Sequence, residues 1–111
     1  MTEYANIKNL PEAQYFTERG YTQAYPWVVV KATAKTRTLA RVLVEQDPDW
    51  KPKMIPGGFA AHCTNQNAQT WLYAGVDMDN QKTVRLTKKG WALRGTRFIE
   101  DRAVHFYDYN F

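Results

Sequence analysis

Two histidines and one cysteine are the side chains of this sequence best suited to catalysis or metal binding. His62 and Cys63 are neighbours, so on an extended strand they point to opposite faces and cannot form a nucleophile and base pair. His105 lies 42 positions after Cys63, and this set matches no zinc-ligand spacing. A lone cysteine is most often a buried, unreactive thiol. We therefore expect a protein that is not an enzyme and has neither a metal nor another cofactor.

Basic residues with aromatic residues between them are the strongest candidates for function. Residues 81–102 contain seven Lys or Arg against two acidic residues, and residues 21–46 contain four against one. Clustered cations attract phosphates or acidic protein surfaces, and an indole offers a stacking face to a base. The predicted binding residues are Lys82, Arg85, Lys88, Lys89, Trp91, Arg94, Arg97 and Arg41. Lys31, Lys35, Arg37 and Arg102 are possible extensions of this set.

Each of these features also has a plain structural interpretation. The cations could form a solvated surface that keeps the protein soluble. Trp91 could fill the core, since large apolar side chains are mostly buried. The chain carries no recognised RNA-binding signature. Four carboxamides follow a Gly-Gly turn and form either a polar loop or a hydrogen-bonding rim for a partner: Asn65, Gln66, Asn67 and Gln69.

Length and composition predict one folded domain over residues 1–111. A chain of 111 residues has room for a single core, and 44% hydrophobic with 14% aromatic residues is too rich for disorder. The net charge is +4. The single cysteine favours a reducing compartment, and we see neither a signal peptide nor a membrane-spanning run. We expect a cytoplasmic protein without membrane contact.

The first twenty residues predict the only helix. Asn9 is a candidate N-cap, Glu12 follows three residues later as in a capping box, and Gly20 stands where such a helix would end. A helix this short is marginal in water, so we expect Tyr15 and Phe16 to dock on a sheet.

The rest of the chain, residues 27–111, predicts short strands. Residues 27–32 are β-branched without clean alternation, which indicates a strand covered on both faces. Residues 38–46 alternate, with Leu39 and Arg41 on one face and Ala40 and Val42 on the other, and complete an antiparallel hairpin. Shorter strands are predicted over residues 53–55, 59–63, 69–73, 83–87, 91–94 and 103–107, with a turn at 56–58 and a loop at 74–80.

Regular spacing of these short strands predicts a mainly β (α+β) fold. We expect a small, partly open antiparallel barrel of five or six strands, with the short N-terminal helix packed on it. The aromatic C-terminus, residues 106–111, should close the sheet.

Several motifs resemble a group of small uncharacterised bacteriophage and prophage proteins. They are Pro56-Gly57-Gly58-Phe59, His62, Asn65-Gln66, Trp71-Leu72-Tyr73, Arg85-Leu86, Lys88-Lys89-Gly90-Trp91 and the ending Phe106-Tyr107-Asp108-Tyr109-Asn110-Phe111. The resemblance covers roughly residues 27–111. Ala60-Ala61 departs from the Gly or Cys expected near His62, so no role is carried over to that histidine.

The resemblance implies an origin more than an activity. Small phage proteins without catalysis often act by binding a host machine, including nucleases of bacterial defence systems. The leading hypothesis is therefore a phage-type binding protein that engages a host protein or nucleoprotein complex, as an anti-CRISPR-like inhibitor would. The alternative is a small barrel that binds RNA or single-stranded DNA directly.

Overall fold

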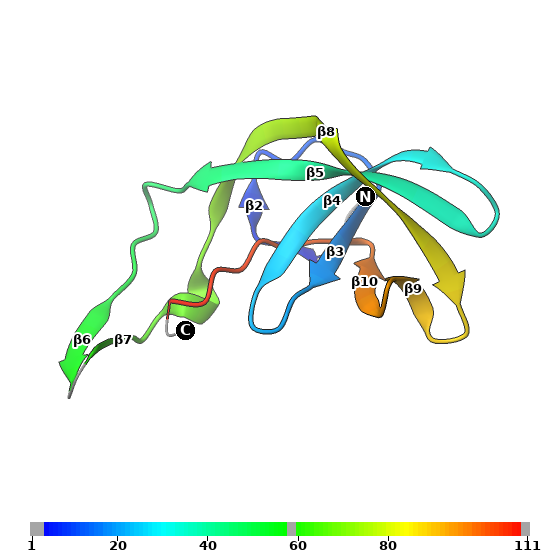
Figure 1. Ribbon diagram of the computed structural model, residues 1–111. Helices are drawn as coiled ribbons and strands as arrows, with labels where there is room; N and C mark the ends of the chain where they lie inside the picture. The colour runs from blue at the N-terminus through cyan, green and yellow to red at the C-terminus, as the bar shows by residue number, and fades with distance from the viewer. Residues whose placement is uncertain (1–3, 58–59, 110–111) are drawn as a thin grey trace.

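Strands make up 61% of this protein in the computed structural model, and their main sheet closes on itself (Figure 1). The structure describes residues 4–57 and 60–109, and of residues 4, 56–57 and 60–62 only the backbone. Seven strands follow the order β2-β8-β5-β4-β3-β10-β9, and β9 pairs back with β8. The hydrogen-bonded pairs thus form a ring of six strands, with β2 attached outside it. The mainly β prediction is confirmed in this form.

The elements have the following bounds: β1 Tyr4–Ala5, β2 Ile7–Lys8, β3 Tyr15–Arg19, β4 Ala24–Ala32, β5 Thr36–Gln46, β6 Met54–Gly57, β7 Ala60–Cys63, η1 Gln66–Ala68, β8 Trp71–Thr87, β9 Gly90–Leu93, β10 Thr96–Glu100 and β11 Arg102–Ala103. Pairings within the ring are antiparallel, whereas β2 joins β8 and β1 joins β11 in parallel.

The β4–β5 hairpin was predicted correctly, including the coverage of both its faces. Trp27 pairs with Arg41 and Val28 with Ala40. Trp27 is 1% exposed and Val28 is 9% exposed, although neighbouring side chains on a strand point to opposite faces. This explains why residues 27–32 show no clean alternation, since each face packs on a separate apolar cluster.

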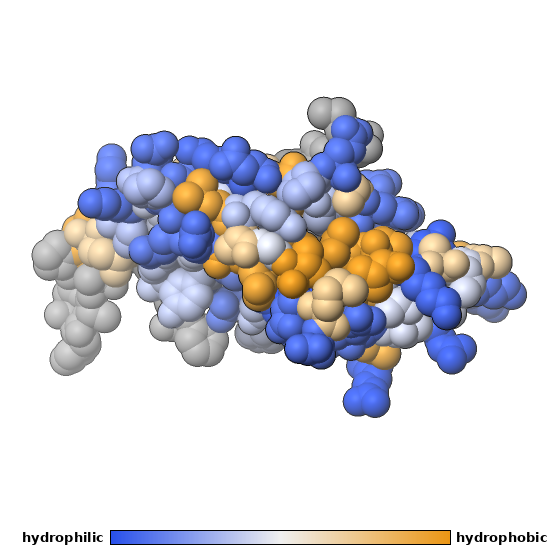
Figure 2. Space-filling model, turned by 90° about the horizontal axis from the view of Figure 1, so that it is seen from above, coloured by the Kyte–Doolittle hydropathy of each residue, from blue (hydrophilic) through white to orange (hydrophobic). Residues whose placement is uncertain are grey.

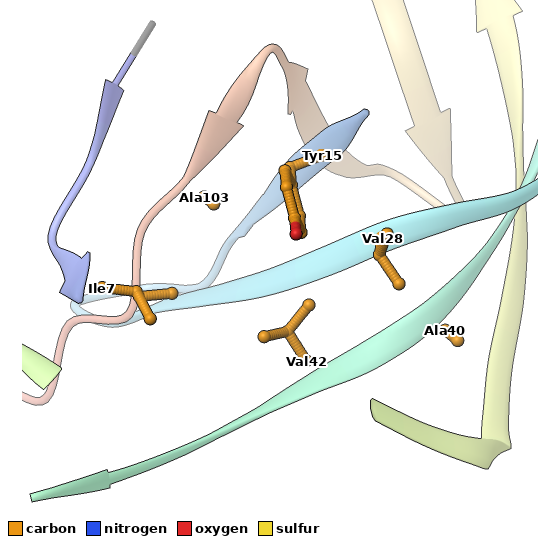
Figure 3. Packing of buried hydrophobic residues seen from close by; sticks show 6 residues of the cluster. All are labelled: Ile7, Tyr15, Val28, Ala40, Val42 and Ala103. Carbon is orange, nitrogen blue, oxygen red and sulfur yellow. The ribbon is translucent and has the colours of Figure 1, made fainter. Parts of the chain in front are cut away.

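Two clusters of buried side chains lie on opposite faces of β4 and β5. The inner cluster fills the ring and consists of Phe16, Trp27, Leu39, Val84, Trp91 and Phe98. The outer cluster consists of Ile7, Tyr15, Val28, Ala40, Val42 and Ala103. In Figure 3 the outer residues converge on the space between β4, β5, the N-terminal segment and the segment around Ala103. Figure 2 shows a hydrophobic band across the face seen from above, bordered by hydrophilic residues.

The helix predicted after Asn9 is wrong, because residues 15–19 form β3. Asn9 has a φ of 63°, outside the extended range of an N-cap residue. Tyr15 packs in the outer cluster and Phe16 in the inner cluster, so these neighbours need the two opposed faces of a strand. Gly20 then starts the β3–β4 turn, where an added Cβ would lie 3.0 Å from the Gln23 carbonyl oxygen. Long-range pairing therefore overrides the local capping signal.

The loop predicted over residues 74–80 is also wrong, because β8 runs through it. The register against β5 shifts between Ala40, opposite Gln81, and Arg41, opposite Asp77. The three residues between Asp77 and Gln81 therefore bulge while the strand continues. The Asp-rich and Gly-containing stretch that favoured a loop lies where the register of β8 shifts. Gly75 has a φ of 116° there.

Of the strand predicted over residues 103–107, only Ala103 lies in a strand, β11. The missed strand β10 pairs with both β3 and β9, and β11 ends at Ala103. The turn before β10 has positive φ at Arg94 (50°) and at Gly95 (82°), as in a two-residue hairpin turn. Beyond Ala103 the described backbone pairs with a strand through an isolated bridge, which joins Phe106 to Ala24.

Strands β6 and β7 form a separate two-stranded ribbon, which projects from one end of the molecule in Figure 1. Its pairing places Met54 opposite Cys63. The predicted turn at residues 56–58 and the Gly58-Phe59 part of the phage-like motif lie outside the described residues.

The pairing of β8 with β9 closes the sheet, and not the C-terminal aromatic segment as predicted. This segment docks through residue 109, where two glutamines hold it. Gln69 Oε1 accepts a hydrogen bond from Tyr107 N at 2.9 Å, and Gln69 Nε2 donates to Tyr107 O at 3.0 Å. Gln66 Oε1 accepts from Tyr109 N at 2.9 Å. Asn65 Oδ1 likewise accepts from Lys53 N at 2.7 Å. These carboxamides bind the chain's own backbone rather than forming a free rim.

Candidate binding surface

The predicted basic residues separate into those at one mouth of the ring and those outside it. At the mouth, Glu18 on β3 is 16% exposed at its side chain and lies 3.5 Å from the Lys82 ammonium of β8. Trp27 Nε1 donates a hydrogen bond of 3.0 Å to the second Glu18 oxygen. The Lys82 ammonium also lies 5.1 Å from the Trp27 ring centroid. Lys82 is therefore engaged by the protein itself.

Arg41 belongs to the same mouth. Its guanidinium carbon lies 4.5 Å from the Tyr25 ring centroid and 5.8 Å from that of Trp27. Burial lowers the pKa of Arg41, and the charge of Glu18 partly opposes this shift. The guanidinium is half-buried and stacked on these rings, so it remains charged but is less accessible to a partner than an exposed arginine.

A cross-strand row of exposed cations lies on the outer face of the ring. Arg85 on β8 and Arg97 on β10 are both paired with Ala92 of β9, one on each side. Neighbouring strands lie about 4.8 Å apart, so the two backbones are separated by about 10 Å with a small side chain between them. Neither arginine forms an ion pair with the described part of the chain. The structure thus brings two of the predicted residues together without neutralising them.

The remaining predicted cations lie on the two turns that flank β9. Lys88 and Lys89 are exposed at the β8–β9 turn, where the Thr87 hydroxyl accepts a hydrogen bond from Lys89 N at 3.2 Å. Arg94 is exposed in the β9–β10 turn and helps to line a small cavity of about 160 Å³ beside Glu18 and Lys82. The two turns are at opposite ends of β9, so Lys88 and Lys89 extend the outer row in one direction only.

Trp91 belongs to the core, which corrects its predicted role as a stacking platform. It is 7% exposed and meets Phe16 edge to face at 5.7 Å between ring centroids. The guanidinium carbon of Arg37 lies 4.7 Å from the Trp91 ring centroid. An indole covered in this way cannot receive a nucleic-acid base.

Among the extending residues, Lys31 and Lys35 are exposed beside the β4–β5 turn. Arg37 donates hydrogen bonds to the carbonyls of Thr33 and Thr36, and so closes that turn. Arg102 is exposed on β11, which pairs with β1 outside the ring.

A cleft of about 340 Å³ adjoins the basic row. The β3–β4 turn and the segment around Arg102 wall it, and its apolar part comes from Ile99, Val104 and Phe106. Among the described residues that line it, Arg19 and Arg102 are basic and none is acidic. Tyr21 is 101% exposed at its rim. The sequence analysis missed Arg19 and Tyr21 because it placed the first in a helix and the second just beyond it, although an Arg-Gly-Tyr turn could have drawn attention to them.

The residues considered for catalysis are not assembled into a site among the described side chains. Cys63 is 2% exposed, and its thiol donates to Asn65 Oδ1 at 3.5 Å. His105 instead meets the rings of Trp71 at 4.5 Å and Tyr25 at 6.4 Å between centroids. The side chain of His62 lies outside the description. Within the described residues no group of three or more His, Cys, Asp or Glu side chains could hold a metal ion.

Comparisons with protein-family models, with curated proteins and with solved structures found no match to this chain. In the described part of the chain, no helix has the length and apolar character to cross a membrane.

Proposed function

We propose that this chain is a non-catalytic, phage-type binding protein that engages a host protein or nucleoprotein machine through the outer face of β8, β9 and β10. The supporting observation is the row Arg85–Ala92–Arg97, exposed and without ion pairs in the described part of the chain. In this proposal the ring of strands is a small, partly open barrel in a host cytoplasm, and Lys88 and Lys89 lengthen its charged face.

Unpaired cations on a rigid sheet suit an anionic partner for two reasons. Two like charges on strands about 10 Å apart repel each other only weakly in water, and both are attracted by an opposing anionic surface. Because the strands are hydrogen-bonded on both sides, binding does not have to order the backbone. Such a face could block a defence nuclease by occupying an acidic patch or covering its bound nucleic acid, as an anti-CRISPR-like inhibitor would.

The test is capture of a partner from a bacterial lysate by two variants of equal charge. Arg85→Gln with Arg97→Gln should lose the captured partner. Lys51→Gln with Lys53→Gln removes two exposed charges next to the projecting ribbon and should retain it. Equal retention or equal loss by both variants would overturn the role of the row, because the effect would then follow net charge or be absent.

Direct binding of RNA or single-stranded DNA is the second candidate, and the basic cleft beside an exposed tyrosine favours it. Nuclease treatment of the lysate separates the two candidates. A partner that stays bound after treatment is a protein, whereas loss of all captured material supports nucleic acid. In the second case, titration with labelled oligonucleotides should show affinity that falls steeply with salt.

A further inference from the structure

The basic row formed by Arg85 and Arg97 continues onto β3. Phe98 of β10 pairs with Glu18 of β3, so one step along this antiparallel register brings Arg97 level with Arg19. Neighbouring strands lie about 4.8 Å apart, so the three arginines follow one line of about 14 Å across β8, β9, β10 and β3. We call these three residues the arginine line.

All three members of the arginine line point to the outer face of the ring. The residue next to each of them points inward: Val84 and Phe98 belong to the inner cluster, and Glu18 accepts a hydrogen bond from an indole of that cluster. Neighbouring side chains on a strand point to opposite faces, so the arginines share the outer one. Each of the three is exposed.

The arginine line carries charge that the protein itself does not neutralise. None of its three guanidinium groups forms an ion pair with the residues that the structure describes. Arg19 and Arg97 lie directly opposite each other on adjacent strands, an arrangement of like charges that is destabilising. A phosphate between them would be attracted by both, and a guanidinium donates paired hydrogen bonds that match its oxygens.

The side chains around the line favour a phosphate backbone over an acidic protein surface. Thr83 and Thr87 flank Arg85 on the same face of β8, and Ala92 lies between Arg85 and Arg97. These positions offer no large apolar side chain, whereas protein interfaces usually centre on a buried aromatic or aliphatic anchor. Contacts to phosphate and sugar come mainly from Arg, Lys and hydroxyl side chains.

Tyr21 favours a single strand over a duplex. It follows Arg19 by two residues in the β3–β4 turn, so the chain keeps the two Cα atoms within about 7 Å of each other. Its side chain is fully exposed, at 101%. An unpaired base can stack on such a ring, whereas a base within a duplex is already stacked on its neighbours.

We propose that the arginine line binds the phosphate backbone of a single-stranded nucleic acid, with one base stacked on Tyr21. The inference rests on the function proposed above, because it uses the same outer face, and it names the strand as what this face meets. Arg19 and Arg97 bind neighbouring phosphate oxygens at one end of the line, and Arg85 binds the backbone farther along. The line reads no base edge, so binding does not depend on sequence.

The experiment is a titration of the full-length protein with labelled oligothymidylate at several salt concentrations. The logarithm of the binding constant falls against the logarithm of salt concentration by about 0.7 per phosphate contact on a single strand. The parent slope should therefore be at least as steep as about −2, for three contacts. Arg19→Gln and Arg97→Gln should each flatten it by about 0.7 and weaken binding about tenfold at low salt.

The matched control is Lys51→Gln, which removes one exposed charge next to the projecting ribbon. It should keep the affinity and the salt slope of the parent. An equal loss in Lys51→Gln and Arg19→Gln would overturn the proposal, because binding would then follow net charge. So would an unchanged salt slope in Arg19→Gln and Arg97→Gln. The replaced side chains are all exposed, so each variant should keep the circular dichroism spectrum of the parent.

Tyr21→Ala separates stacking from charge. This variant should bind oligothymidylate about fivefold more weakly with an unchanged salt slope, and its weaker binding of a duplex should match that of the parent. Duplex binding by the parent as tight as that of the single strand, or no effect of Tyr21→Ala, would overturn the assignment to a single strand. A polyglutamate peptide that competes as well as the oligonucleotide would identify an acidic protein surface instead.

Capture from the lysate distinguishes failure of this inference from failure of the proposed function. Suppose that the double variant of Arg85 and Arg97 loses its captured partner while the parent does not bind oligothymidylate. The face then meets a protein, so the proposed function stands and the strand is excluded. Conversely, oligothymidylate binding that is lost in Arg97→Gln, with capture unchanged in the double variant, supports the strand and overturns the role of the row in capture.

Discussion

His105 is held where protonation is unfavourable. Burial lowers its pKa to about 4, and the positive charge of Arg41 adds to the shift. Its ring meets Trp71 edge to face, and its backbone is fixed by Asn6, whose Oδ1 accepts from His105 N at 3.0 Å and whose Nδ2 donates to His105 O at 2.7 Å. A charged imidazole here would need either solvent or a change in the aromatic packing.

Stability should therefore fall as the pH is lowered from about 6.5 towards 4. In this window the unfolded chain binds a proton at His105 and the folded chain does not, so acid favours unfolding by at most about tenfold per pH unit. Asp47 does not contribute in this window, because the hydrogen bond from Lys8 lowers the pKa of its carboxyl group to about 2. The free energy of unfolding, measured in urea, should change less between pH 5 and pH 7 for His105→Phe than for the parent. An unchanged slope in this variant would assign the effect to other groups, with His62→Gln as the control.

At the scale of single residues, the sequence offers candidate binding cations but does not show where they lie. Arg85 and Arg97 share a face because each pairs with Ala92, but that register is a long-range property and no local pattern reveals it. The alternation of residues 38–46 did place Arg41 with Leu39. It could not show that Glu18 and Tyr25 would come from other strands to meet that side chain.

Among the elements, the 3₁₀ turn η1 and its glutamines determine how the C-terminus docks. Gln69 is 2% exposed, and its side chain forms hydrogen bonds with Tyr107 N and O, with Gln66 O and with Trp71 Nε1. Replacing it with alanine leaves several of these polar groups without a partner, each of which is costly when buried.

We expect Gln69→Ala to lower the free energy of unfolding by about 3 kcal/mol, and Gln66→Ala, which loses the hydrogen bond to Tyr109 N, by about 1 kcal/mol. Asn67→Ala, at an exposed position of the same turn, is the control and should change little. Urea denaturation of the three variants gives the comparison. Equal, small effects at residues 66, 67 and 69 would show that the aromatic segment is held by ring packing alone.

Element prediction succeeded where the pattern was local and failed where distant strands decided it. The strand at residues 27–32 and the alternation after it came directly from residue type, and both are present in β4 and β5. The capping signals around Asn9 do not lead to a helix, because β3 pairs with β4 and β10. The turn-forming residues of 74–80 do not form a loop, because β8 pairs with β5 and accommodates them in bulges.

For the molecule as a whole, the important feature is that two apolar clusters share one pair of strands. Leu39 is 0% exposed and belongs to the inner cluster, while Val42 is 1% exposed and belongs to the outer one. Both lie on β5, three positions apart and on opposite faces. Since loss of either cluster would strip one side of the same hairpin, the clusters should not unfold separately.

We therefore expect Leu39→Ala and Val42→Ala to shift one common unfolding transition. The losses should be about 3 kcal/mol and about 2 kcal/mol, because each change removes buried methyl groups and leaves a cavity. In urea the midpoint should fall in both variants while the slope stays that of the parent, since the surface exposed on unfolding is unchanged. Tryptophan fluorescence and far-ultraviolet circular dichroism should give coincident curves. A biphasic curve in Val42→Ala, with the inner cluster melting later, would instead mean that the ring is stable without its outer covering.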